Sequence, residues 1–269
     1  MLNRSNLYAE KERAVSFAAS VIGNIISMPT ALTLQFAPGH RPVSDDIVRL
    51  ALRPAETTKF AVSHLPKPEE GWLELIAMGL TFDASGLAPD EQAPAFAAEH
   101  MFGLDVSAFD QHLETVRLDP SPHLAGGRML LPVLRVLCGL GAELARLPGL
   151  RAVGWEASAS WMAPAYFMSA IRAWLVGGAF PSLGLTAFSV TDTGALQSHG
   201  LALFTGYEAQ IAAKAGESPQ ELAKLAARAI HLLVQAGPKG LDSLADPAGQ
   251  TLHCEMQHDQ QLLRLWREG

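Results

Sequence analysis

Short hydrophobic runs and alternating patterns in the first half of the chain predict a sheet with one early helix. Every second side chain of a strand faces the same side, so alternation of apolar and polar residues is typical of strands, as is a short run that is apolar on both faces. Ser44 can cap a helix whose first turn holds Asp45 and Asp46, because the positive end of a helix dipole favours acidic side chains. The predicted strands are 31–36, 59–63, 72–82 and 112–118.

In the second half, longer apolar stretches with helical spacing alternate with strands. Ser218 and Glu221 are spaced as in a capping box, with Pro219 between them, and predict the start of a helix. A helix is also predicted at 129–147. From residue 151 the predicted order is β-α-β-β-α-β, the ferredoxin-like split unit with two helices on one face of a four-stranded antiparallel sheet. Its elements are a strand at 151–157, a helix at 164–176, a hairpin of 183–191 and 200–213, a helix at 218–236 and a strand at 251–256.

These elements place the chain in the α+β class, with helices packed on a mixed or antiparallel sheet. Residues 1–30 are predicted to form an N-terminal helix that ends before Pro29. Residues 31–122 form a first α+β half and residues 123–269 a second, and we expect the halves to pack as one compact unit. The first half begins with the same order of elements as the second, so a divergent duplication is one interpretation.

Composition narrows the class of protein without identifying it. Hydrophobic residues make up 49% and charged residues 17% of the chain, which is enough apolar surface to fold around a core. The formal net charge of -7 would repel a phosphate backbone, and no run of Lys and Arg offsets it, which argues against a nucleic-acid partner. Gly126 and Gly127 precede an apolar helix, but the Gly-x-x-x-x-Gly-Lys-Ser/Thr pattern of a phosphate-binding loop is absent, and we predict no cofactor.

Two apolar stretches approach the length of a membrane-spanning helix, but both carry charges that argue against a span. Arg135 and Glu143 lie within 129–147, and Arg172 lies in the middle of 161–180. An ionised side chain at the centre of a bilayer costs about 2.5–3.5 kcal/mol, so we predict buried helices instead. The two cysteines are far apart and in apolar surroundings, as expected for thiols in a reducing compartment, and we predict a cytoplasmic location.

Two segments resemble an uncharacterised bacterial family, domain of unknown function 4261. The first is Ala152–Trp155 (AVGW), followed by Met162 and Phe167, and the second is Gly200–Glu208 (GLALFTGYE). Members of that family carry a strand of small and aliphatic residues ending in Trp, and later a Gly-Leu segment ending in Glu. The resemblance covers roughly the second half of the chain. It implies an α+β fold and no known activity, so it adds no catalytic residue.

A carboxylate on a predicted strand is the main candidate for catalysis. Glu208 falls on the polar face of the 200–213 strand, and His199 directly precedes that strand. With Asp192 in the hairpin turn and Glu156 on a neighbouring strand, these residues could form an acid/base cluster in which Glu208 is the general base. A carboxylate that is solvated, or that accepts hydrogen bonds from backbone N–H groups, explains Glu208 without catalysis and is the preferred interpretation.

A short string near the C-terminus offers metal-ligand chemistry. Cys254, Met256 and His258 would project from one face of a strand and offer soft donors for copper(I) or zinc. The same alternation explains Cys254 and Met256 as core residues, and no second cluster such as CxxC or HExxH completes four ligands. We therefore predict no metal site and keep these three residues as the candidates.

Aromatic residues concentrate around one predicted strand and helix. Trp161 and Tyr166 are the predicted interface residues among them, because amphipathic aromatics are enriched at the centres of protein interfaces. With no complete catalytic or cofactor motif, we expect a non-enzymatic protein that binds a protein partner or forms a homodimer. The alternative is a small-molecule enzyme or ligand-binding protein with a carboxylate-centred pocket around Glu208.

Overall fold

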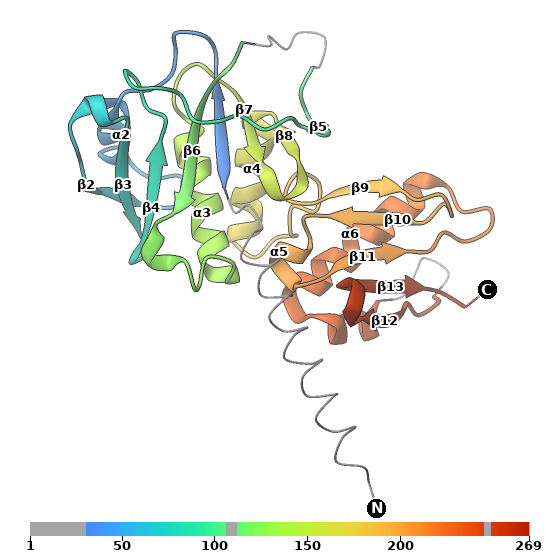
Figure 1. Ribbon diagram of the computed structural model, residues 1–269. Coiled ribbons are helices and arrows are strands. Elements are labelled where there is room, and N and C mark those ends of the chain that lie inside the picture. Colours follow the sequence, from blue (N-terminus) through green and yellow to red (C-terminus); the bar gives the residue numbers. More distant parts are fainter. Residues whose placement is uncertain (1–30, 106–111, 245–248, 269) are drawn as a thin grey trace, which may run out of the picture.

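The computed structural model describes residues 31–105, 112–244 and 249–268, which form two β-sheets with helices packed on them (Figure 1). This arrangement confirms the predicted α+β class. The predicted N-terminal helix of residues 1–30 lies outside the described residues. In the part of the chain that is described, no helix combines the length and the apolar character needed to cross a bilayer.

An eight-stranded sheet forms the larger part of the molecule. Its strands are β1 (Leu32–Phe36), β2 (Phe60–His64), β3 (Trp72–Ala77), β4 (Leu80–Ser85), β5 (His100–Phe102), β6 (Glu114–Pro120), β7 (Leu150–Trp155) and β8 (Ser160–Met162). They follow the order β2-β3-β4-β6-β1-β7-β8-β5 across the sheet. All neighbours are antiparallel except β5 and β8, which are parallel.

A five-stranded sheet follows in the C-terminal part of the chain. Its strands are β9 (Ala187–Val190), β10 (Leu196–His199), β11 (Glu208–Ile211), β12 (His253–Gln257) and β13 (Leu262–Trp266). They follow the order β12-β13-β11-β10-β9 across the sheet. The pair of β11 and β13 is parallel, and the other neighbours are antiparallel.

The longer helices each pack on one face of a sheet (Figure 1). The α-helices in the described residues are α2 (Ser44–Ala51), α3 (Leu131–Leu144), α4 (Pro164–Leu175), α5 (Ala202–Thr205) and α6 (Pro219–Ala236). Helices α3 and α4 contact the eight-stranded sheet, and α6 contacts the five-stranded sheet. At the start of α6, the Ser218 hydroxyl accepts from the Glu221 N–H at 3.2 Å, and the Glu221 carboxylate accepts from the Ser218 N–H at 3.0 Å. These two bonds confirm the predicted capping box.

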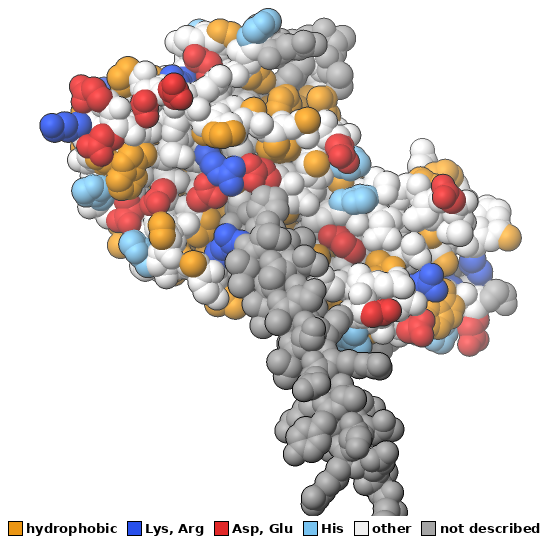
Figure 2. Space-filling model, in the orientation of Figure 1, with side chains coloured by type: hydrophobic (Ala, Val, Ile, Leu, Met, Phe, Trp, Pro, Cys, Tyr) orange, Lys and Arg blue, Asp and Glu red, His pale blue; other side chains and the backbone are white. Residues whose placement is uncertain are grey.

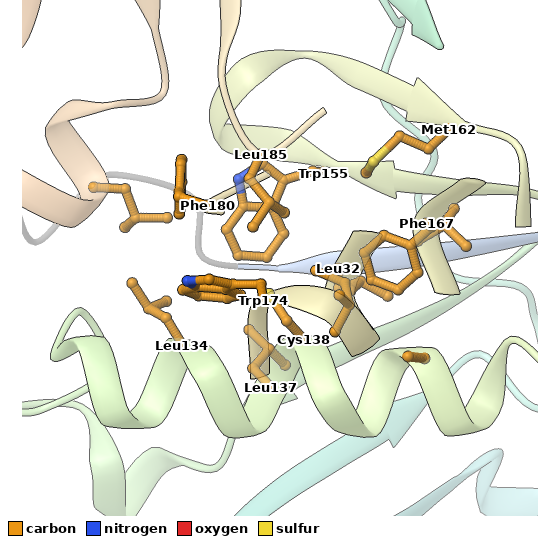
Figure 3. Packing of buried hydrophobic residues seen from close by; sticks show 14 of the residues in the cluster. Leu32, Leu134, Leu137, Cys138, Trp155, Met162, Phe167, Trp174, Phe180 and Leu185 are labelled. Atoms are coloured by element: carbon orange, nitrogen blue, oxygen red, sulfur yellow. The ribbon is translucent and has the colours of Figure 1, made fainter. Parts of the chain in front are cut away.

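An aromatic cluster connects the two sheets through one hydrophobic core. Figure 3 shows Trp155, Trp174 and Phe180 of this cluster. Trp155 at the end of β7 stacks on Phe204 of α5, with 6.2 Å between ring centroids. Phe180 packs edge-on against both Phe204 and Trp174 of α4, at 4.9 Å and 5.4 Å. Because Trp155 belongs to the larger sheet and Phe204 lies just before β11, burial of these rings holds the two sheets together.

The predicted split unit does not form as one sheet. Strand β7, which overlaps the predicted strand 151–157, pairs with β1 and joins the eight-stranded sheet, and β8 extends it. The sheets therefore divide after α4 rather than at residue 122. They also differ in strand number and order, so the topology does not support the interpretation of the two halves as a divergent duplication. Hydrophobic spacing determines which face of a strand is buried, but it does not determine which strand lies beside it.

The predicted hairpin of 183–191 and 200–213 is wrong in its second strand. The partner of β9 is β10, which lies between the two predicted strands, and the predicted second strand is divided between α5 and β11. Gly200 and Gly206 flank this short helix with φ of +83° and +81°. Glycine adopts such left-handed backbone readily, so the chain can enter and leave a single helical turn between two strands.

Candidate functional site

Glu208 is the first residue of β11, and its carboxylate lies against the N-terminal end of α5. Oε2 accepts hydrogen bonds from the Ser198 hydroxyl and, at 3.3 Å, from the Leu201 N–H, while Oε1 accepts from the Ala202 N–H at 3.2 Å. Burial raises the pKa of Glu208 above its ordinary value, although these bonds favour the ionised form. The carboxylate satisfies backbone donors at a helix end, in line with the preferred sequence interpretation.

The histidine and the turn carboxylate of the predicted acid/base cluster lie at opposite ends of the β9–β10 hairpin. His199 ends β10, where its Nε2 lies 2.7 Å from the Ser189 hydroxyl. Its ring stacks on His100 of the larger sheet, with 6.0 Å between centroids. Burial lowers the pKa of His100, and the nearby His199 lowers it further. Asp192 is exposed in the turn at the other end of the hairpin.

Glu156 belongs to an ion-pair network on the eight-stranded sheet. Its Oε1 accepts a hydrogen bond from Arg117 Nη1 at 2.5 Å, and Arg117 Nε also donates to Asp119 at 2.6 Å. Glu156 is thus bound to Arg117, whereas Glu208 is bound to Ser198 and the start of α5. Among the described residues no hydrogen bond or ion pair joins the four candidates, so the predicted acid/base cluster does not assemble. The physical reason is that β7, which leads into Glu156, pairs with β1 instead of with strands of the second half.

The three metal-ligand candidates do not converge on a common point. Cys254 and Met256 share a face of β12, where both are paired with leucines of β13. His258 has left the strand and lies in a 3-10 turn, with Nδ1 at 2.7 Å from the Tyr207 hydroxyl. Among the described residues, no group of three His, Cys, Asp or Glu side chains is arranged to hold a metal ion.

Trp161 and Tyr166, the predicted interface residues, contact other parts of the fold. Trp161 on β8 is half-buried and packs edge-on against Phe96, with 6.2 Å between centroids. Tyr166 on α4 donates its hydroxyl to the Leu183 carbonyl at 2.9 Å and stacks on Phe102 at 6.4 Å. Burial raises the pKa of Tyr166. These contacts already account for much of both rings, and only part of each remains for a partner.

One open sheet face carries a row of carboxylates. Glu74, Asp83 and Asp119 lie opposite one another on β3, β4 and β6, and Figure 2 shows acidic side chains following one another across these strands. A hollow of about 320 Å³ lies beside them, lined in part by Trp72 and Arg128. We call this surface the carboxylate face.

Each carboxylate of this face has a hydrogen-bond partner within the fold. Ser63 and His123 contact Glu74, Ser121 donates to Asp83, and Arg117 donates to Asp119.

The five-stranded sheet, on the side away from α6, holds a second hollow, of about 350 Å³, with different chemistry. Trp266 is 39% exposed there, and its ring stacks on His253 with 5.7 Å between centroids. Arg264 and Glu255 lie directly opposite each other on β13 and β12, yet neither side chain makes a hydrogen bond or an ion pair with a described residue. Figure 2 shows basic, acidic and hydrophobic side chains side by side over these two strands. We call this surface the Arg264 face; its lining includes Thr193, Ala195, Gln210, Ala212, Glu255, Arg264 and Trp266.

Sequence reasoning alone does not find this second face, because the predicted elements end with the strand 251–256 and leave out β13. The signal is present in the sequence. Leu263 and Leu265 alternate with Arg264 and Trp266, which is the pattern of a strand with one buried face. Because successive side chains of a strand point to opposite faces, this pattern places the Arg264 guanidinium and the Trp266 indole together on the outer side of the sheet.

Comparison with known proteins gives no indication of function, so function is inferred from the two sheet faces described above. The chain matches no family model, no curated protein and no solved structure. The resemblance of its second half to domain of unknown function 4261 therefore stays a prediction.

Proposed function

We propose that the protein is a non-enzymatic interaction protein whose Arg264 face binds a protein partner. The observation that carries this proposal is the exposed indole of Trp266 beside the Arg264 guanidinium, which pairs with no described residue, around a hollow on an open sheet face. Trp and Arg are among the residue types most enriched where binding energy is concentrated in protein interfaces. The indole offers apolar area to a partner, and the guanidinium offers donors to its acceptor groups.

The alternative function, an enzyme or ligand-binding protein centred on Glu208, has less support. A general base must reach the proton that it abstracts, whereas the Glu208 carboxylate is engaged with Ser198 and with backbone N–H groups. Glu208 also lines neither of the two hollows. Its geometry therefore favours a structural role over catalysis.

The carboxylate face is a weaker candidate for the binding surface. Its carboxylates accept hydrogen bonds from side chains of the fold, and the bond from Ser63 holds the pKa of Glu74 below its ordinary value. A partner would have to replace such bonds before it gained any. Arg264 and Glu255 require no such exchange, because no described residue holds them.

A cytoplasmic location is part of the same proposal. Cys138 is buried, and neither Cys138 nor Cys254 forms a disulfide. Burial raises the pKa of the Cys138 thiol, which keeps it protonated and unreactive. Thiols that form no disulfide are typical of proteins in a reducing compartment.

Site-specific photo-crosslinking in the native cell tests the binding face. A photoreactive residue at Thr193, which lines the hollow, should give covalent adducts with protein. Trp266→Ala in the same chain should remove most of these adducts, because it removes the indole that anchors the partner.

The matched control is the same photoreactive residue at Arg228, an exposed position on α6 on the opposite side of the same sheet. We expect few adducts there, and Trp266→Ala should leave them unchanged. If Thr193 gives no more adducts than Arg228, the Arg264 face is not a protein-binding surface and the proposal is wrong.

A further inference from the structure

We infer that the protein bound at the Arg264 face is a second copy of this chain, related to the first by a two-fold axis. This inference rests on the proposed function and names the partner for the same face. A two-fold interface uses the same patch on both copies, so the patch must be complementary to itself. The charges of the Arg264 face meet that requirement.

The register of β12 and β13 supplies the complementarity. Glu255 lies opposite Arg264, and His253 lies opposite Trp266, so each strand contributes one charged and one aromatic residue at matched positions. Within the described chain, Arg264 and Glu255 form no ion pair with each other or with any other residue. Two charges of opposite sign therefore stand side by side on the outer face, each available to a partner.

Consider a two-fold axis that runs parallel to β12 and β13, above the outer face of the sheet and midway between the two strands. Rotation about this axis brings each strand of one copy over the other strand of the second copy. When the outer faces of two copies meet about this axis, β13 of one copy lies over β12 of the other. Arg264 then faces Glu255 of the second copy, and the reverse pair forms at the same height because the two residues are in register. Trp266 likewise faces His253 of the second copy. The interface thus contains two equivalent ion pairs beside two aromatic contacts.

Net charge favours this face over the other open face. A chain with a formal charge of -7 repels its own copies, so self-association needs a patch where opposite charges meet. On the carboxylate face, Glu74, Asp83 and Asp119 would confront carboxylates of the second copy. The Arg264 face carries one positive and one negative charge in its hollow and avoids that repulsion.

A charge-exchange experiment tests the inference. Arg264→Glu leaves only acidic charge at this site, and Glu255→Arg leaves only basic charge. We expect the unmodified chain to be a dimer by sedimentation equilibrium, and each variant alone to dimerise roughly tenfold or more weakly, since like charges then face each other. An equimolar mixture of the two variants should form a one-to-one heterodimer, and the chain that carries both substitutions should dimerise again.

Arg228→Glu on α6 is the control, because it makes the same charge change on the opposite side of the sheet and should leave dimerisation unchanged. Trp266→Ala is an independent variant that weakens the dimer without changing charge. A monomeric unmodified chain, a dimer that tolerates both charge reversals, or variants that fail to associate when mixed would each overturn the inference. If the chain is monomeric while Thr193 crosslinks to a different protein, the inference fails and the proposed function stands. If Thr193 gives no specific adduct, both fail.

Discussion

The carboxylate face and the Arg264 face are both open sheet surfaces with a hollow of similar size, and they differ in whether their charges are already satisfied. On the first, Glu74, Asp83 and Asp119 each accept a hydrogen bond from a side chain of the fold. On the second, Arg264 and Glu255 have no such partner among the described residues. Charged side chains that already have partners inside the fold contribute to its stability. Exposed charged side chains that have no such partner, and that lie beside an indole, are available for binding.

The same contrast extends to Glu143 and Glu208, two carboxylates that accept hydrogen bonds within the fold. Glu143 on α3 is buried and accepts hydrogen bonds from the Glu56 N–H at 2.6 Å, from the Thr57 N–H and from Arg146 at 2.6 Å. It thereby fixes the segment between α2 and β2 onto α3. Glu208 performs a similar task at α5. Substitutions at these residues should change stability, and substitutions on the Arg264 face should change association.

The largest effect is expected at Glu143. Glu143→Ala leaves the N–H groups of Glu56 and Thr57 and the Arg146 guanidinium without their acceptor, so the free energy of unfolding should fall by about 3 kcal/mol. Denaturant unfolding measures this loss, at protein concentrations where the chain is monomeric so that a change in dimerisation does not contribute. Glu255→Ala removes an exposed carboxylate without a described partner and serves as the control. Equal stability of the two variants would contradict the distinction between satisfied and available charges.

A smaller loss is expected at Glu208. Glu208→Ala leaves the Ser198 hydroxyl and two N–H groups of the α5 turn unpaired, and we expect a loss of about 2 kcal/mol in the free energy of unfolding. Sedimentation equilibrium should show unchanged self-association, because Glu208 does not line the hollow. A variant of normal stability with a lost binding or catalytic activity would instead favour the alternative function centred on Glu208.

The contributions of Glu143 and Glu208 to the free energy of unfolding should change with pH in opposite directions. At Glu143, burial raises the pKa, but the hydrogen bonds from Thr57 and Arg146 outweigh it and hold the pKa below its ordinary value. Its contribution is complete above the unfolded pKa and is lost as the pH falls through the folded pKa. Burial raises the pKa of Glu208, so its contribution instead becomes more favourable as the pH falls from neutral through the raised folded value.

Unfolding free energies of the unmodified chain, Glu143→Gln and Glu208→Gln over a series of pH values measure these contributions. The difference between the unmodified chain and Glu143→Gln should shrink as the solution becomes acidic. The corresponding difference for Glu208→Gln should move in the opposite direction. Parallel curves would show that the two environments do not shift the two pKa values in opposite directions.

Local signals in the sequence predict local structure well in this chain. The spacing of Ser218 and Glu221 predicts the start of α6, because a capping box needs only residues within one helical turn. The apolar alternation at 31–36 predicts β1, and the interpretation of Glu208 as an acceptor of backbone donors agrees with its contacts. These features depend on neighbours that are close in the sequence or on one general rule about burial.

Features that depend on distant parts of the chain are harder to predict. Strand β7 pairs with β1, more than a hundred residues away, and this pairing leads Glu156 into an ion pair with Arg117 of the larger sheet instead of a cluster with Glu208. The helical turn α5 interrupts a run whose alternation is typical of a strand, because glycines at both ends allow the chain to turn. The Arg264 face brings the β9–β10 turn and β11 together with β12 and β13, so it can be recognised only once the sheet order is known.

The smallest effect on stability, and the sharpest separation of stability from association, is expected on the Arg264 face. Trp266 is 39% exposed and lies on the outer side of β13. At protein concentrations where the unmodified chain is monomeric, Trp266→Ala and Arg264→Ala should therefore each change the free energy of unfolding by no more than about 0.5–1 kcal/mol. Both should nevertheless weaken self-association clearly, because the removed groups contact the second copy and not the core. A large loss of stability in either variant would place these side chains with Glu143 and Glu208, as parts of the fold whose interactions are already complete within one chain.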